Sequence, residues 1–194
     1  MTDPSPVFYS EGADPEMRTA NERAHATFRY FWREVAWERR RIIPGLDLAA
    51  IKAPFADGDL AAEGAEVEHM WITDVNFDGR DVTGTLLNSP VGLTSVKEGD
   101  SVRIPLGLVG DWMYVVGGKV YGAYTVNVLR SRMDPRERRA HDAAWGLDFG
   151  DPWKIRLNPW GDGPRGLLRR WFGPRHDEQA VPGEHPMSVA MAPS

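Results

Sequence analysis

The chain has no cysteine among its 194 residues, which excludes disulfides, thiolate metal sites and cysteine nucleophiles. Any metal would have to bind histidine and carboxylate side chains, yet the five histidines form no HxH or HxxxH pair. The sequence therefore predicts neither a metal site nor a cofactor.

Long apolar runs are also missing, because no window reaches the roughly 18 consecutive apolar residues that a membrane span requires. The first residues, MTDPSPVFYSEGADPE, lack the basic start and apolar stretch of a secretory signal. These two observations predict a cytoplasmic protein that does not associate with a membrane.

Charge is unevenly distributed along a chain of net charge −5. Residues 57–100 hold ten acidic residues against Arg80 and Lys97, whereas residues 16–41 hold seven arginines against four glutamates. We interpret the arginines as a solvated helix face, the alternative being a basic strip that contacts nucleic acid or an acidic partner. Nucleic acid is a disfavoured partner, because the acidic region would repel phosphate.

A long amphipathic helix is predicted to follow Asp14-Pro15. Asp can accept hydrogen bonds from the first free amides, and Pro fits the first turn because it has no amide to leave unpaired. Pro44-Gly45 marks the end of this helical region. Apolar residues recur at intervals of three and four and define one buried stripe: Met17, Ala20, Ala24, Phe28, Phe31 and Val35.

From Leu48 onward the apolar pattern alternates, which favours β-strands. Gly122 lies inside the last predicted strand, where a glycine indicates a bend or a close approach of another group. The predicted strands are Leu48 to Ala53 (ended by Pro54), Val67 to Val75, Asp81 to Leu87, a strand carrying Val102, Ile104 and Leu106, and a hairpin of Trp112 to Val116 with Lys119 to Arg130 around Gly117-Gly118.

A second, short helix should run from Asp134-Pro135 to Gly146. The predicted fold class is α+β: a long N-terminal amphipathic helix packed on a strongly bent, mostly antiparallel sheet of about five or six strands, then the short helix and an irregular tail. The predicted division is a flexible N-terminus (1–13), the α+β domain (14–152), a wrapping segment rich in Trp and Pro (153–173) and a disordered tail (174–194).

Several phrases together resemble the YegJ-like family of bacterial domains of unknown function (DUF2314): ATFRYFWRE, IIPGLDLAAIKAPF, VEHMWI, GTLLNSP, VKEGDSVRIPL, DWMYV and GKVYGAYTVNVLR. The resemblance covers roughly Ala24 to Pro152. It implies a small bacterial α+β domain, mostly cytoplasmic, with no established reaction, and it supplies no catalytic residues to carry over. It also implies a possible protein partner, a toxin or effector bound by an immunity-type protein.

Catalytic motifs are not evident from the residues themselves. Glu68 and His69 are neighbours on one strand and must face opposite ways, so they cannot act side by side. We expect His69 to be a satisfied core residue and Glu68 to be paired with an arginine or to open into a pocket. His141-Asp142 lacks the further histidines of a metal dyad, and no GxSxG is present.

The sequence therefore favours a protein- or ligand-binding module without chemistry of its own. The alternative is a small hydrolase that uses Glu68 with His69 or Asp111 across a cleft. For Asp111 and Trp112 we favour a structural role, in which Asp111 ties down backbone amides and Trp112 covers the open end of the core, and ligand contact is the alternative. The hypothetical binding residues lie near strand ends and in the last hairpin: Glu68, Asn88, Asp111, Trp112, Tyr121 and Asn127.

Overall fold

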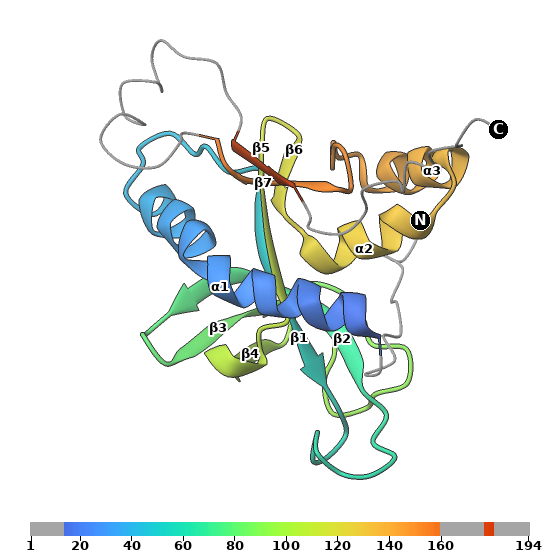
Figure 1. The fold of residues 1–194 in the computed structure, drawn as a ribbon. Helices are drawn as coiled ribbons and strands as arrows, with labels where there is room; N and C mark the ends of the chain where they lie inside the picture. Colours follow the sequence, from blue (N-terminus) through green and yellow to red (C-terminus); the bar gives the residue numbers. More distant parts are fainter. Residues whose placement is uncertain (1–13, 160–176, 181–194) are drawn as a thin grey trace, which may run out of the picture.

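The computed structural model describes residues 14–159 and 177–180. Helices and strands follow one another along the chain as shown in Figure 1. Their bounds are α1 (Pro15–Glu38), β1 (Leu48–Phe55), β2 (Glu68–Phe77), β3 (Asp81–Leu86), β4 (Ser101–Pro105), the 3-10 turn η1 (Leu106–Leu108), β5 (Asp111–Val116), β6 (Lys119–Gly122), α2 (Tyr124–Arg132), α3 (Pro135–Trp145), β7 (Lys154–Asn158) and β8 (Asp177–Ala180).

Helix α1 begins as the sequence predicts. Asp14 Oδ1 accepts hydrogen bonds from the amides of Glu16 (3.0 Å) and Met17 (3.4 Å), and Pro15 occupies the first turn. All six residues of the predicted apolar stripe are buried, and the helix lies across one face of the sheet (Figure 1). The long N-terminal amphipathic helix is therefore confirmed.

Six strands form one antiparallel sheet in the order β4-β3-β2-β1-β5-β6, with β7 and β8 as a separate pair. Strand β1 is central, and its alternate residues serve two cores. Ile51 and Ala53 pack with the α1 side chains, whereas Ala50 packs with Met113 and Phe149 on the other face. The predicted α+β class is confirmed, and the β3–β4 end lies at a steep angle to β5–β6 (Figure 1).

The prediction of one strand from Lys119 to Arg130 is wrong beyond Gly122. Gly122 and Ala123 both have positive φ (78° and 58°), and the chain turns there into helix α2. A Cβ on Gly122 would lie 2.4 Å from the carbonyl oxygen of Trp112, so the predicted close approach at this glycine is confirmed. Two consecutive residues with left-handed backbone conformation end the strand, although the β-branched residues that follow favour strand structure.

Two smaller differences concern strand ends. Strand β1 continues through Pro54 to Phe55, because pairing with β5 stops at Lys52 and leaves only β2 alongside Pro54. Strand β4 ends at Pro105, and Leu106 begins the η1 turn rather than continuing the strand.

Helix α3 matches the predicted second helix, with a capping box between Asp134 and Glu137 and Gly146 in the left-handed region at its end. After it, β7 lies inside the predicted wrapping segment. Strand β8 lies inside the predicted disordered tail, and most of that tail and the N-terminal segment 1–13 lie outside the described residues.

Candidate binding site

Glu68 and Asn88 both hold the connection between β3 and β4. Glu68 is 1% exposed, and its carboxylate accepts hydrogen bonds from the amides of Val91 (2.9 Å to Oε2), Gly92 and Leu93. The half-buried Asn88 accepts a hydrogen bond from the amide of Trp71 (3.0 Å). Glu68 thus neither pairs with an arginine nor opens into a pocket; backbone amides are its partners.

A second carboxylate, which sequence reasoning missed, holds the same connection. Asp57 accepts hydrogen bonds from the amides of Ser95 and Thr94, both at 2.8 Å. Hydrogen bonds from Ser95 and then Thr94 hold the pKa of Asp57 well below its usual value. Two carboxylates therefore bind five consecutive amides, residues 91–95, and fix the path of the chain into β4.

Asp111 is fully buried and caps α2. Its Oδ1 accepts from the amides of Trp112 (2.8 Å) and Tyr124 (3.0 Å), and its Oδ2 accepts from the amide (2.8 Å) and hydroxyl (2.7 Å) of Thr125. Burial raises the pKa of Asp111, against the opposing effects of the Thr125 hydrogen bonds and the charge of Lys52. The structural alternative for Asp111, fastening backbone amides, is the arrangement observed.

Lys52 lies beside this aspartate on the neighbouring strand and is only 8% exposed. Its Nζ donates a long hydrogen bond to Thr125 Oγ1 (3.4 Å) and lies 5.7 Å from the centre of the Trp71 ring. Burial lowers the pKa of Lys52, and the Asp111 charge opposes that shift. We call Asp111, Thr125 and Lys52 the Asp111 cluster.

His69 faces the same side of the sheet as Lys52 and Trp71. Burial, and secondarily the charge of Lys52, lower the pKa of His69 to about 4, so the ring is neutral at pH 7. Its Nδ1 is buried and has no hydrogen-bond partner among the described residues. The prediction of a satisfied core histidine is therefore wrong, because the ring is only partly buried and one nitrogen is unpaired.

Trp112, Tyr121 and Asn127 are buried in the chain's own contacts. Trp112 Nε1 donates to the carbonyl of Ala24 (2.8 Å), and the Tyr121 ring stacks on Tyr114 with centroids 5.0 Å apart. Asn127 lies on α2, not on a strand, and accepts a hydrogen bond from Arg130. Arg130 also forms a bidentate pair with Asp142, which explains the His141-Asp142 dipeptide as part of a structural network. Ligand binding by the six residues selected from sequence stays a prediction.

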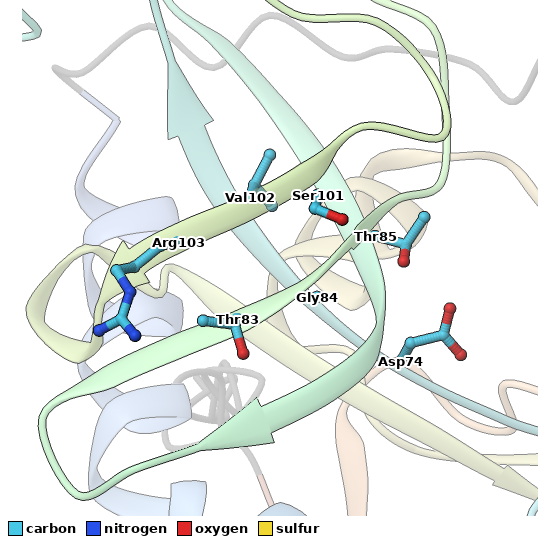
Figure 2. Close-up of a pocket in the computed structure, with 7 residues that line it drawn as sticks. All are labelled: Asp74, Thr83, Gly84, Thr85, Ser101, Val102 and Arg103. Carbon is cyan, nitrogen blue, oxygen red and sulfur yellow. The ribbon is translucent and has the colours of Figure 1, made fainter.

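A pocket of about 410 Å³ lies elsewhere, on the face of β2, β3 and β4 (Figure 2). We call it the β2–β4 pocket, and its volume falls within the range of small-ligand sites. The lining combines three hydroxyl groups, one carboxylate and one guanidinium: Asp74, Thr83, Gly84, Thr85, Ser101, Val102 and Arg103.

Two features bring the pocket residues together: the register between β3 and β4 and a bulge where β2 pairs with β3. Thr83 pairs with Arg103 and Thr85 with Ser101, so these four side chains share one face. The β2–β3 register shifts between Thr73 and Asn76, and Asp74 at that irregularity has φ 52°. The bulge thereby carries the Asp74 side chain to the pocket.

Gly84 permits the close strand spacing at this point. A Cβ there would lie 2.3 Å from the Thr73 carbonyl oxygen and 2.6 Å from Ile72 Cγ2, so a larger residue would displace β2. Gly84 in GTLLNSP is a signal that the sequence does contain, since a glycine inside a strand marks a bulge or a close approach, but it does not identify Asp74 as a pocket residue.

The two charged groups of the pocket differ in their partners. Arg103 Nη1 lies 2.8 Å from Asp81 Oδ2 and 3.2 Å from Asp78 Oδ2, and hydrogen bonds to these two carboxylates raise the pKa of Arg103. Asp74 is exposed, and within residues 14–159 no side chain or amide is recorded as its partner. Figure 2 places the two at opposite ends of the pocket. The unpaired charge of this surface is therefore negative.

In the part of the chain that the structure describes, no three His, Asp or Glu residues are placed to hold a metal ion. None of the helices in these described ranges has the length and apolarity to cross a membrane.

Comparison with known proteins identifies relatives. A protein of Neisseria meningitidis serogroup B with the name "Putative ankyrin repeat protein NMB1133/NMB1171" is 49% identical over 158 residues, which is 81% of this chain and 61% of the relative. The protein named "Uncharacterized protein YegJ" of Escherichia coli K12 is 36% identical over 83 residues, 43% of this chain and 50% of the relative. The chain thus spans about half to three fifths of these curated relatives.

No solved structure matches the chain. The family model described as "Uncharacterized protein conserved in bacteria (DUF2314)" matches residues 14–149, which contain α1 to α3 and both polar sites. The predicted resemblance is therefore confirmed, and the chain belongs to the DUF2314 family.

Proposed function

We propose that this domain is a binding module that takes a basic side chain of a partner protein in the β2–β4 pocket. The observation that carries the proposal is the exposed and unpaired Asp74 carboxylate in a pocket that also presents three free hydroxyl groups. A carboxylate with adjacent hydroxyls offers acceptors for an arginine or lysine side chain.

The charge of the surrounding strands supports a basic partner. Residues 74–103 hold five acidic side chains against three basic ones, a balance of −2. Arg103, the basic residue nearest the pocket, is already paired with two carboxylates. A positively charged group would therefore be attracted to the pocket and a negatively charged one repelled.

The relatives are compatible with a binding role. One of them carries the name of an ankyrin repeat protein, and ankyrin repeats build extended binding surfaces. A toxin or effector bound by an immunity-type protein is one form of partner, which the family resemblance suggests. No observation favours the hydrolase alternative, since Glu68 is occupied by backbone amides and Asp111 is fully buried.

The proposal can be tested with synthetic peptides. Two peptides of about nine residues that alternate threonine and valine, one with a central arginine and one with a central glutamate, are titrated into ¹⁵N-labelled protein. We expect the arginine peptide to bind with a Kd of about 1 mM or below and to shift the resonances of Thr83, Thr85 and Ser101. Equal binding of the glutamate peptide would overturn the proposal.

Variants of the protein locate the interaction. Asp74→Asn should weaken binding of the arginine peptide by about tenfold, because it removes the unpaired charge and retains the shape of the side chain. Glu63→Gln is the matched control, since it removes the same charge from an exposed residue outside the pocket. If both variants lose the same affinity for the arginine peptide, the effect is general electrostatic attraction and not binding at the pocket.

A further inference from the structure

Strand β4 is an edge of the six-stranded sheet, and the hydrogen bonds show which of its backbone groups face outward. Leu86 donates to the carbonyl of Asp100, and Leu106 donates to the carbonyl of Arg80, so even-numbered residues of this strand face β3. Because the direction alternates along a strand, Ser101, Arg103 and Pro105 direct their backbone groups away from the sheet.

These outward groups have no backbone partner among the described residues, and Ser101, Arg103 and Pro105 are all exposed. The opposite edge, β6, is covered: Val120 donates to the carbonyl of Asp148 (2.9 Å), and Asp148 donates to that of Gly118 (2.9 Å). The free β4 edge therefore offers two amides and three carbonyls to another strand, since proline has no amide.

The free edge and the β2–β4 pocket are parts of one surface. Ser101 and Arg103 contribute outward backbone groups, and their side chains also line the pocket. In an antiparallel pair, residues that face each other across hydrogen bonds direct their side chains to the same face. A strand added to β4 would thus place every second side chain beside the pocket.

Charge and distance define the segment that fits. A second copy of this domain would bring the same net charge of −2 from residues 74–103 next to this surface, which disfavours pairing of two β4 strands. Three strand spacings of about 4.8 Å separate an added strand from β2, so about 14 Å lies between its backbone and that of Asp74. The arginine side chain, the longest basic one, suits this distance better than lysine.

We propose that a partner protein adds an extended segment antiparallel to β4, with an arginine side chain that crosses β4 into the pocket toward Asp74. This inference rests on the proposed function and specifies how the partner binds. It belongs to the known mode of recognition in which main-chain hydrogen bonds supply affinity and pockets for alternate side chains supply specificity.

The experiment uses the arginine peptide with backbone N-methyl groups, which remove amide donors without changing the side chains. The arginine residue faces the pocket, so its own amide and those two positions away point toward β4, and the amides of its immediate neighbours point away. Methylation of the first set should weaken binding at least about tenfold, whereas methylation of the second set should change it less than about threefold.

Hydrogen exchange in the protein gives an independent measurement. At saturating peptide, the amides of Ser101 and Arg103 should exchange at least about tenfold more slowly, because only these two outward amides gain partners. The amides of Val102 and Ile104 already face β3 and serve as internal controls, with no change expected.

The outcomes separate the two proposals. If both methylated peptides bind equally well while Asp74→Asn still weakens binding, strand addition is wrong and the pocket function stands. If the methylation pattern is observed but Asp74→Asn and wild-type protein bind alike, strand addition stands and the role of the pocket is wrong. Absence of binding by the unmethylated arginine peptide would overturn both.

Discussion

The Asp111 cluster and the β2–β4 pocket contain the same chemical groups in opposite situations. Each has an aspartate, a basic residue and threonine, one in the cluster and two in the pocket. In the cluster the aspartate is fully buried and accepts four hydrogen bonds from its own chain, whereas in the pocket Asp74 is exposed and accepts none from the described residues. The difference shows that a polar group becomes available to a partner only where the fold leaves it unsatisfied.

The cause of the difference is local backbone structure. At Asp111 the chain returns through Gly122 and Ala123, and the first amides of α2 arrive at the carboxylate. At Asp74 the bulge places the side chain at the pocket, and no amide of the described residues donates to it. A carboxylate whose oxygens accept hydrogen bonds from the chain's own amides therefore holds the fold together, whereas one without such partners remains free to bind a ligand.

The largest effect is expected from Asp111→Ala, which should lower the free energy of unfolding by about 3–5 kcal/mol. The change leaves the amides of Tyr124 and Thr125 unpaired in the interior and Lys52 without its nearby negative charge. Denaturant unfolding measures the loss, with Asp111→Asn as the milder variant because it keeps one acceptor oxygen. A loss below 1 kcal/mol, about the value for an exposed cap, would mean that the cluster is not a main source of stability.

The same local causes determine which elements can be predicted from the sequence. The starts of α1 and α3 could be predicted from their Asp-Pro caps, as could the apolar stripe of α1 and the end of α3 at Gly146. The predicted end of α1 at Pro44-Gly45 is wrong, since the helix ends at Glu38. Helix α2 could not, since Val126 and Val128 alternate as in a strand and the two residues with positive φ include an alanine. The amides of Tyr124 and Thr125 donate tertiary hydrogen bonds to Asp111 there, and local propensity does not reveal them.

The six residues chosen from sequence show the same limit. Polar and aromatic residues near strand ends are candidates for ligand contact, yet five of them are buried with partners in the chain. The pocket residues were missed because a threonine that alternates with apolar neighbours is typical of any half-exposed strand. Only the three-dimensional register, which aligns Thr83 with Arg103 and Thr85 with Ser101, reveals them as one surface.

A second prediction concerns acid stability and His69. The folded-state pKa of about 4 lies below the usual 6.5, so the unfolded chain binds more protons between these values. Stability should therefore fall as the pH decreases from about 6.5 to about 4, by about 1–3 kcal/mol from this histidine.

The measurement compares unfolding at a series of pH values for wild type and His69→Gln, which retains Asp111. That control is needed because a raised pKa at Asp111 acts in the opposite direction, binding more protons in the folded state. The variant should lose most of the decline in this pH window. If the variant loses stability over this pH range as wild type does, groups other than His69 cause the loss.

Trp112→Phe should lower stability by a smaller amount, about 1–2 kcal/mol, since it removes one buried hydrogen bond to the Ala24 carbonyl. Tyr121→Phe is the companion variant, because it preserves the stacked ring. Both proteins should bind the arginine peptide as wild type does, once measured well below their unfolding midpoints. Loss of peptide binding with intact stability would instead indicate that Trp112 or Tyr121 contacts the ligand.

The smallest effect on stability is expected from Asp74→Asn, within about 0.5 kcal/mol of wild type. Asparagine tolerates positive φ about as well as aspartate, and no hydrogen bond from the described residues is lost. The thermal and denaturant unfolding curves should therefore superimpose on those of wild type. The same substitution should nevertheless weaken binding of the arginine peptide about tenfold. A loss of 2 kcal/mol or more would show that Asp74, like Asp111, is part of the scaffold, and the contrast between the two sites would then disappear.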